Sequence, residues 1–252
     1  MTERSLLWAY GVVPASQPAP GVRGIEGRAV AAVTHGGLAA LASTVPAERF
    51  AGEALQQRLE DLETVAELAR AHDSVLEAAM AGGDVVPFRM CTIYETRAAI
   101  ERMLAAEASR FARLMARLHD KAEWGVKAFV APRAGAADAP RPSSGIAYLA
   151  RRRAERDAVA AEREAIETAA AEVHTALAER ATSAVLSRPH DRRLSGRDQE
   201  MLLNGAYLLE RRAEDDFARA VESLARTYRA QGLTLELTGP WPPYHFVVEA
   251  AA

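Results

Sequence analysis

The spacing of apolar residues changes several times along the chain, and this succession limits the possible folds more than any other feature. The run from Leu6 to Val13 is continuously apolar and ends at Pro14, which is typical of a buried strand. Short apolar segments follow at 25–33 and 38–45, and the turn residues His35-Gly36-Gly37 separate them. A glycine turn between two strand-like segments favours a hairpin. The sequence therefore opens with a predicted small sheet.

Helical spacing replaces strand spacing in the next part of the chain. Apolar residues recur at three or four positions from Leu55 to Leu76, which predicts a helix that ends at Gly82-Gly83. The apolar run from Val85 to Tyr94 carries a proline and is predicted to be a strand. A second amphipathic helix is expected over 96–119. These elements complete a predicted first domain over residues 1–122.

A second domain is predicted over residues 123–249. Its expected elements are a strand at 124–130, a long helix from 146 to about 184, a short strand at 185–186, a strand at 201–210, a helix at 215–229 and a last strand at 233–237. This β-α-β-β-α-β order is the split βαβ, or ferredoxin-like, pattern. The fold class is thus predicted to be α+β, with an N-terminal mixed α/β unit and a C-terminal ferredoxin-like unit that contains a long helix.

Charge and cysteine content limit the surroundings in which the chain works. The 252 residues carry 31 basic and 34 acidic groups, for a net charge of −3, which gives no general attraction to nucleic acid or anionic lipid. Cys91 is the single cysteine, so no intrachain disulfide forms and a reducing compartment fits. The sequence has neither a long apolar run nor a typical signal peptide. We therefore expect a soluble, cytoplasmic protein that binds neither nucleic acid nor membrane.

The residues do not form a recognisable catalytic set. Glycine-rich phosphate loops, HExxH and paired CxxC motifs are all missing from the sequence. The six histidines are never three or four residues apart, so one helix cannot supply a metal site, although distant segments still could. Cys91 and His72 could act as nucleophile and base, but a buried thiol and a packed histidine explain them as well. We assign no catalytic residue, metal or cofactor, and expect no enzyme.

The run Arg151-Arg152-Arg153 is the one concentrated basic patch of the sequence. It could dock an acidic surface of a partner. Alternatively, it is a solvated helix face whose charges pair at a spacing of four residues, as Arg151 would with Glu155 and Arg153 with Asp157.

Gly239 to Tyr244 contains three prolines and two large aromatic residues, Trp241 and Tyr244. Proline rings fix the backbone φ angle, so the segment is expected to be stiff and to end regular structure. A stiff segment that presents aromatic side chains loses little entropy on binding, which favours recognition of a partner. The alternative is a strand terminator whose tryptophan packs back onto the protein, and both interpretations can hold together.

Several of these segments resemble motifs of the gas vesicle protein GvpF/GvpL family. The stretch Leu235–Val247, which contains Gly-Pro-Trp-Pro-Pro-Tyr, is similar to the proline-aromatic signature of that family. Further resemblances occur in family order at Leu7–Val13, Ala71–Leu76, Val85–Tyr94, Trp124–Lys127, Gly145–Leu149 and Asn204–Leu209. They span nearly the whole chain. Two positions depart from the family pattern: Cys91 stands where glycine is expected, and His245 replaces a small polar residue.

The resemblance implies a two-domain α+β fold with a ferredoxin-like C-terminal part and an accessory role in building gas vesicles. It also implies contacts with the small hydrophobic shell protein GvpA and with other accessory proteins during nucleation or growth, and a gas vesicle-associated place in the cytoplasm. A shell subunit with a large apolar face would aggregate before assembly unless another protein covers that face. A non-enzymatic assembly factor for buoyant vesicles is therefore the leading hypothesis.

Three residues are our candidates for partner binding: Arg89, Trp241 and Tyr244. Arg89 could instead pair with a carboxylate at the junction between the domains. Two other functions are kept as alternatives: a small-molecule-binding regulatory module of ferredoxin-like type, and an enzyme that uses Cys91 or a pair of histidines.

Overall fold

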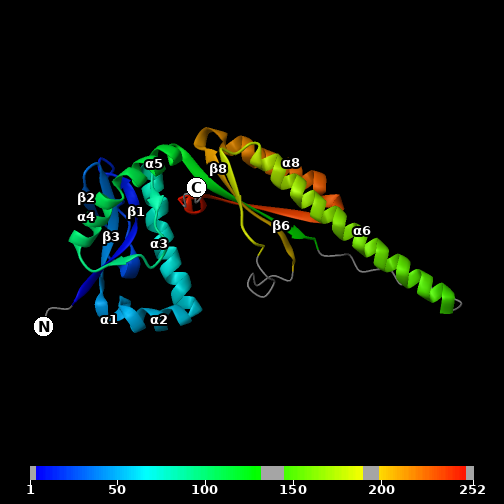
Figure 1. The fold of residues 1–252 in the computed structure, drawn as a ribbon, viewed down its shortest axis with the longest axis horizontal. Helices are drawn as coiled ribbons and strands as arrows, with labels where there is room; N and C mark the ends of the chain where they lie inside the picture. The colour runs from blue at the N-terminus through cyan, green and yellow to red at the C-terminus, as the bar shows by residue number, and fades with distance from the viewer. Residues whose placement is uncertain (1–3, 132–144, 190–198, 248–252) are drawn as a thin grey trace. The chain divides into compact units, whose positions relative to one another are not determined.

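The computed structural model describes residues 4–131, 145–189 and 199–247. The chain divides into two compact units: unit 1 combines the residues up to Glu123 with the chain from Pro240 onward, and unit 2 spans Trp124–Gly239. Each unit combines helices with an antiparallel sheet (Figure 1), which confirms the α+β fold class. The segment from Pro240, which the sequence analysis assigned to the second domain, groups with unit 1.

The sheet of unit 1 is built around strand β1, Ser5–Pro14. Its strand order is β2-β3-β1-β4, and β5 also pairs with β1. The other strands are β2 Ala31–His35, β3 Leu38–Pro46, β4 Val86–Pro87 and β5 Ile93–Tyr94. β1 pairs with β3 along its whole length, with a register shift between Ala9 and Gly11. The predicted hairpin between β2 and β3 is confirmed, and Gly36 at φ +60° makes its turn possible.

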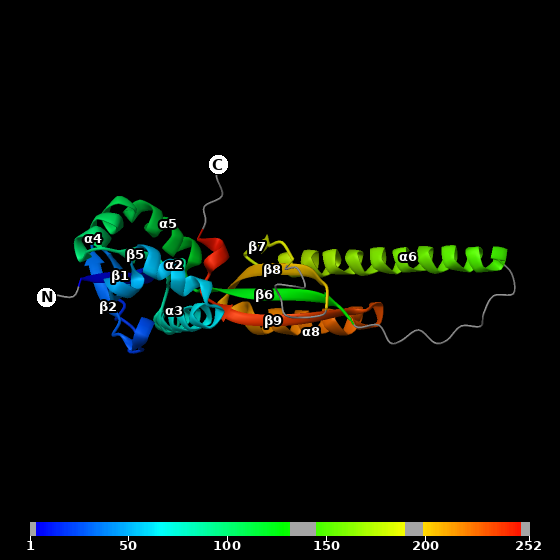
Figure 2. The same cartoon turned by 90° about the horizontal axis from the view of Figure 1, so that it is seen from below.

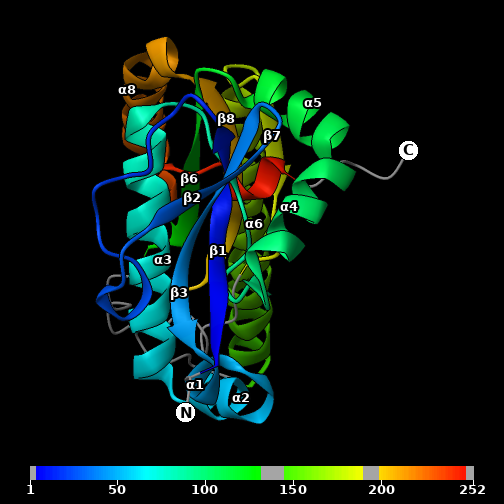
Figure 3. The same cartoon turned by 90° about the vertical axis from the view of Figure 1, so that its left-hand side faces the viewer.

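The helices of unit 1 are shorter than the apolar spacing predicted. They are α1 Ala47–Phe50, α2 Gly52–Glu60, α3 Leu62–Gly82, α4 Arg97–Ala106 and α5 Ala108–Leu118. Asp61 separates α2 from α3, because its side chain accepts the backbone N–H groups of Glu63 and Thr64 and so caps α3. The expected helix over 96–119 is likewise divided at Glu107. In Figure 3, α3 and the α4–α5 pair lie on either side of β1.

Two predicted strands of unit 1 were wrong in extent. The segment expected to be a strand at 25–33 begins with a 3₁₀ turn, Ile25–Gly27, and enters β2 only at Ala31. Glu26 has φ +53°, which a strand cannot accommodate. The single strand expected at 85–94 is divided into β4 and β5, because Cys91 between them has φ +67°.

A buried polar link joins three segments of unit 1. The Nε1–H of Trp8 on β1 donates to Nδ1 of His72 on α3 at 3.0 Å. The Nε2 atom of His72 lies 3.1 Å from the carbonyl oxygen of Phe88. Because Nδ1 accepts a hydrogen bond, the ring proton of the neutral imidazole is on Nε2, which donates to Phe88. Burial lowers the pKa of His72, so the folded protein holds it neutral.

Unit 2 has the element order β6-α6-β7-β8-α8-β9. These elements are β6 Lys121–Val130, α6 Gly145–Ala178, β7 Ser183–Leu186, β8 Met201–Glu210, α8 Glu214–Tyr228 and β9 Leu233–Trp241. The sheet order is β7-β8-β6-β9, and Figure 2 shows β8, β6 and β9 side by side. Short 3₁₀ turns occupy 211–213, 229–231 and 244–246. Residues 131–144 are rich in Pro, Gly, Ala and Ser, which predicts a loop or linker, but nearly all of them lie outside the described residues.

The long helix α6 is only partly covered by its own unit. Among the side chains of α6 that the structure describes, those that are buried lie in its C-terminal half: Ile166, Ala169, Ala170, Val173 and Leu177. The helix ends at Ala178, whereas the sequence predicted an end near 184, because β7 begins at Ser183 and pairs with β8.

Within the described residues, none of the helices has both the length and the apolar character that crossing a membrane requires.

Strand β9 continues through the first prolyl residue of the proline-aromatic segment. Regular structure was expected to stop at Gly239, but β9 runs to Trp241. The reason is its position, because β9 is at the edge of the sheet. A proline on an edge strand can turn its missing N–H away from the neighbouring strand, so Pro240 does not interrupt the pairing.

We predict that His72 makes unit 1 sensitive to acid. Below a pH of about 6.5 the unfolded chain takes up a proton on this histidine, whereas the folded protein resists protonation. The free energy of unfolding should therefore fall as the pH falls below that value. His72→Gln should remove this contribution to the pH dependence. At neutral pH it should also lower the free energy of unfolding by about 1–3 kcal/mol, because it alters buried hydrogen bonds.

Urea unfolding at pH 5 and pH 7.5 measures both effects. His35→Gln is the matched control, because His35 is exposed at the end of β2. A His72→Gln protein with the same loss on acidification as the wild type would contradict the prediction.

Candidate functional site

Three separate sequence motifs meet at two consecutive residues of α3, and we name this place the α3 junction. It consists of His72 and Asp73, the turn Phe88–Thr92 and the tail Pro240–Val247. His72 holds the carbonyl of Phe88, as described above. Its neighbour Asp73 accepts a hydrogen bond from the Tyr244 hydroxyl at 2.7 Å. Three of the motifs that carried the family resemblance are therefore in contact with one another.

The tail is anchored to unit 1 along most of its length. Phe246 is fully buried, and both Pro242 and Pro243 are buried. Burial, together with the hydrogen bond to Asp73, raises the pKa of Tyr244, so the phenol keeps its proton and donates a hydrogen bond to the carboxylate. Tyr244 therefore fixes the tail in place, and its hydroxyl is already used within the chain.

Glu123 and His245 form a second anchor for the tail. One carboxylate oxygen of Glu123 accepts the backbone N–H of His245 at 2.9 Å, and the other lies 2.6 Å from Nδ1 of the same residue. The Glu123 side chain is only 6% exposed. A buried carboxylate requires hydrogen-bonding partners, and this bond raises the pKa of His245. The histidine that departs from the family pattern thus serves this chain as the partner of a buried acid.

The turn Phe88–Thr92 is held by its backbone. The N–H groups of Phe88 and Ala9 donate to the carbonyl oxygens of Tyr10 and Thr92, each at 2.8 Å. The Thr92 hydroxyl donates to the carbonyl oxygen of Arg89 at 2.7 Å. Cys91 has a left-handed φ of +67°, which glycine adopts without strain. The special turn for which the family pattern has glycine is therefore present here with a cysteine in it.

The geometry gives no support to Cys91 and His72 as a nucleophile and base. Both ring nitrogens of His72 already bond within the chain, to Trp8 and to Phe88. Burial raises the pKa of the Cys91 thiol, which reduces the thiolate that a nucleophile needs. Among the described residues there is also no group of three or more His, Cys, Asp or Glu side chains that could hold a metal ion.

The three candidate binding residues differ in what they offer to a partner. Arg89 is exposed, and its side chain forms no ion pair with any residue that the structure describes. Trp241 is 38% exposed at the end of β9. Tyr244 is partly buried and engaged with Asp73. Arg89 and Trp241 thus present side chains to solvent from anchored backbone, while their part in binding stays a prediction.

Sequence reasoning missed Asp73 and Glu123, which position the tail. Asp73 follows a buried histidine on α3, and Glu123 is an acidic residue in an apolar strand. An acid at such a position signals a buried partner, but the sequence does not say which residue that partner is.

The basic run of α6 forms the pairs that its spacing suggested. Arg151 lies 3.2 Å from Glu155, and Arg153 lies 3.9 Å from Asp157. The guanidinium of Arg152 lies over the ring of Tyr148, at 6.0 Å from its centroid. These contacts favour a solvated helix face.

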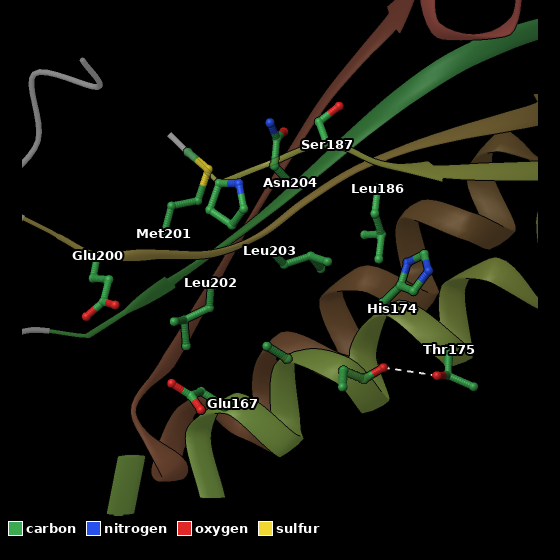
Figure 4. Close-up of a pocket in the computed structure, with 13 residues that line it drawn as sticks. Glu167, His174, Thr175, Leu186, Ser187, Glu200, Met201, Leu202, Leu203 and Asn204 are labelled. Carbon is green, nitrogen blue, oxygen red and sulfur yellow. Dashed lines mark hydrogen bonds between the residues drawn. The ribbon is translucent and has the colours of Figure 1, made fainter. Parts of the chain in front are cut away.

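Unit 2 contains a pocket of about 610 Å³ between α6 and the strands β7 and β8 (Figure 4). Leu186, Leu202 and Leu203 give it an apolar wall, and His174, Ser187 and Asn204 add polar groups. Its volume lies in the range of small-molecule sites, about 300–1,000 Å³. Burial raises the pKa of Tyr207, whose hydroxyl is 2.9 Å from Nδ1 of His174 and therefore donates to it.

Comparison with known sequences and structures adds independent findings. A family described as "Gas vesicle synthesis protein GvpL/GvpF" matches residues 6–248. Gas vesicle protein L of Streptomyces sp. (strain CB03234) is 34% identical over 242 residues, which cover 94% of this chain and 88% of that protein. Gas vesicle protein F of the same strain is 28% identical over 257 residues, which cover 95% of this chain and 98% of that protein.

Solved structures of similar proteins share the fold. The crystal structure of GvpF from Anabaena sp. PCC7120 superimposes with a TM-score of 0.68 at 18% sequence identity, covering 98% of each chain. The crystal structure of GvpF from Microcystis aeruginosa gives a TM-score of 0.66 at 20% identity, covering 97% of this chain and 99% of that one.

We predict that Cys91→Gly stabilises the protein. Glycine removes the steric cost of a side chain at φ +67°, although its greater freedom in the unfolded chain offsets part of the gain. The free energy of unfolding should rise by about 0.5–1 kcal/mol. Cys91→Ala keeps a Cβ atom and is the matched control. Equal urea midpoints for the glycine and alanine variants would show that no strain is stored in this turn.

We also predict that Tyr244→Phe loosens the tail. The change removes a hydrogen bond to an ionised carboxylate and should lower the free energy of unfolding by about 1.5 kcal/mol. Limited proteolysis should cut the variant faster near its C-terminal end, and the fluorescence of the tryptophans should report the change in their surroundings. Tyr148→Phe on the exposed half of α6 is the control. Proteolysis at the wild-type rate would argue against an anchoring role for the hydroxyl.

Proposed function

The chain belongs to the gas vesicle synthesis protein GvpL/GvpF family, and from this membership we propose that it binds the small hydrophobic shell protein GvpA and other accessory proteins during nucleation or growth of the vesicle. The family implies a role in gas vesicle formation. We further propose that the protein acts by binding, without catalysis, and that it is associated with gas vesicles in the cytoplasm.

The observation that carries this proposal is that the α3 junction combines exposed side chains with residues held in place by hydrogen bonds. Arg89 and Trp241 present exposed side chains, and residues near them in the chain are held by the partly buried hydrogen bonds of His72 with the Phe88 carbonyl and of Tyr244 with Asp73. Tryptophan and arginine are enriched among the residues that dominate protein–protein binding. Because the backbone beneath them is fixed, binding a partner would order few additional groups, which favours affinity.

The partner that this surface fits is a protein with an exposed apolar face. A shell subunit must hide such a face before assembly, since large apolar patches drive aggregation. Trp241 supplies apolar area, and Arg89 can pair with a carboxylate of the partner. The surface could therefore cover a shell subunit and release it to the growing vesicle.

We infer in addition that unit 2 is of ferredoxin-like type. The support is its β-α-β-β-α-β order and the position of β8 between β6 and β7, the two strands that α6 connects. The division into domains at residues 1–122 and 123–249 remains a proposal. A fragment of 123–249 would carry Tyr244 without the part of unit 1 on which it packs.

A small-molecule-binding regulatory function is the second candidate. The pocket beside β7 favours it, because its volume and mixed lining suit a small ligand. A metabolite that occupied the pocket would raise the melting temperature of the protein in a screen.

Binding of purified shell protein, under conditions that keep it soluble, tests the main proposal. Arg89→Glu and Trp241→Ala should each weaken binding about tenfold or more, which corresponds to a loss of about 1.4 kcal/mol. The matched controls are Arg102→Glu and Leu62→Ala, which change an exposed arginine and an exposed apolar residue elsewhere on unit 1.

The controls should bind as the wild type does. Wild-type protein that does not bind shell protein would end the proposal. Arg89 and Trp241 variants that bind no worse than the controls would move the site away from the α3 junction.

A further inference from the structure

The first half of α6, residues 145–165, extends away from the core of its unit, and we name it the outer half. Every residue from Arg152 to Ala165 is exposed, whereas the next residue, Ile166, is buried in the core of unit 2. Figure 2 shows this half of the helix continuing past the strands of the unit. A helix of this length has little stability without tertiary contacts, so a packing partner would stabilise it.

The outer half carries large apolar side chains that its own unit leaves exposed. Tyr148, Leu149 and Val159 are 44%, 68% and 47% exposed. Val159 lies seven residues before Ile166 and fourteen before Val173, both of which are buried in unit 2. Residues seven apart lie on one side of a helix, so the side of α6 that packs in unit 2 continues outward as an exposed stripe. This outer stripe consists of Tyr148, Leu149, Arg152, Glu155 and Val159.

The charges of the outer half are almost balanced. Residues 145–165 contain five arginines and four acidic residues, for a net charge of +1. The pairs of Arg151 with Glu155 and of Arg153 with Asp157 lie within the helix. A strongly acidic or strongly basic partner would therefore find little general attraction here. The stripe instead holds both signs in a fixed order, with one arginine three residues before one glutamate.

A second copy of the same helix, lying antiparallel, matches this order. When the two-fold axis passes between residues 153 and 154, Arg152 of each copy faces Glu155 of the other. In the next layer outward, Tyr148 of each copy faces Val159 of the other. The layers beside the axis therefore pair opposite charges, and the layers beyond them pair apolar side chains. A surface that complements itself in this way is what a two-fold symmetric contact requires.

The side chains beside these layers suit the same register. On one flank, Leu149 of one copy lies next to Arg156 of the other, where it can cover the aliphatic part of the arginine. On the other flank, Arg151 lies next to Ala158 of the second copy and keeps its pair with Glu155 at 3.2 Å. No layer sets two like charges face to face.

We propose that two copies of this chain associate through the outer stripes of their α6 helices, as an antiparallel pair in which Arg152 of each copy binds Glu155 of the other. The outer half is about 30 Å long, which places the contact near the small end of specific interfaces and predicts a dimer that forms at micromolar concentrations. This inference goes beyond the proposed function, because the contact needs no shell protein.

Sedimentation equilibrium of the full chain tests the proposal. The wild type should pass from monomer to dimer between about 1 and 300 µM. Arg152→Glu sets two glutamates against each other, and Glu155→Arg sets two arginines against each other, so each variant alone should dimerise about tenfold more weakly or worse. An equimolar mixture of the two variants should recover dimers, because every facing pair is then of opposite charge.

Arg153→Glu and Glu164→Arg are the matched controls, since they reverse the same charges at exposed positions of α6 outside the stripe. Both should dimerise as the wild type does. Circular dichroism establishes that each variant keeps its helices.

Three results would overturn the antiparallel pair: a wild type that stays monomeric throughout this range, a mixture of the two variants that stays monomeric, or stripe variants that dimerise as well as the controls. A monomeric wild type whose binding to purified shell protein is lost on Arg152→Glu would also overturn it, and would assign the stripe to that protein. Failure of shell-protein binding by a protein that dimerises as described would remove the proposed function and leave this inference standing.

Discussion

The neutral imidazole of His72 is the constraint on which unit 1 depends. It accepts a hydrogen bond from Trp8 on β1 and donates one to the carbonyl of Phe88, so one side chain joins a helix, the central strand and a turn. Accepting at one ring nitrogen while donating from the other requires the uncharged ring, which burial favours. The next residue, Asp73, takes the Tyr244 hydroxyl. A change in the orientation of α3 would disturb the turn and the tail together.

The tail combines two properties that the sequence presented as alternatives. Tyr244 and His245 bond to buried or partly buried carboxylates, so the segment does pack back onto the protein. Trp241 is still 38% exposed, so the same segment also presents an aromatic surface. These properties support each other, because an anchored backbone holds an exposed tryptophan in one place.

Unit 2 supplies a different type of surface. The short strand β7 exposes outward backbone groups at the edge of the sheet, whereas β9 at the other edge contains a proline near its end. Proline on an edge strand discourages pairing with another chain, and β7 lacks that protection. The two units thus differ at their surfaces, since unit 1 exposes the Trp241 side chain and unit 2 ends its sheet in the edge strand β7.

The sequence by itself determined the kinds of element, because helix and strand periods are local properties of ten or so residues. It also indicated the proline-aromatic motif, whose composition restricts the backbone, but it predicted one strand over 85–94 and missed the turn that contains Cys91. Tertiary structure decided what those elements do. The contact of Tyr244 with Asp73 joins residues 171 positions apart, and that of His245 with Glu123 joins residues 122 positions apart. Local patterns cannot specify such partners, because the sequence contains many acidic residues. Only the packing of the fold brings the carboxylate of one of them within 3 Å of the Tyr244 hydroxyl or the His245 ring. The same reason explains why β9 continues through Pro240: the sequence shows the missing donor, and only the sheet order shows that an edge strand can do without it.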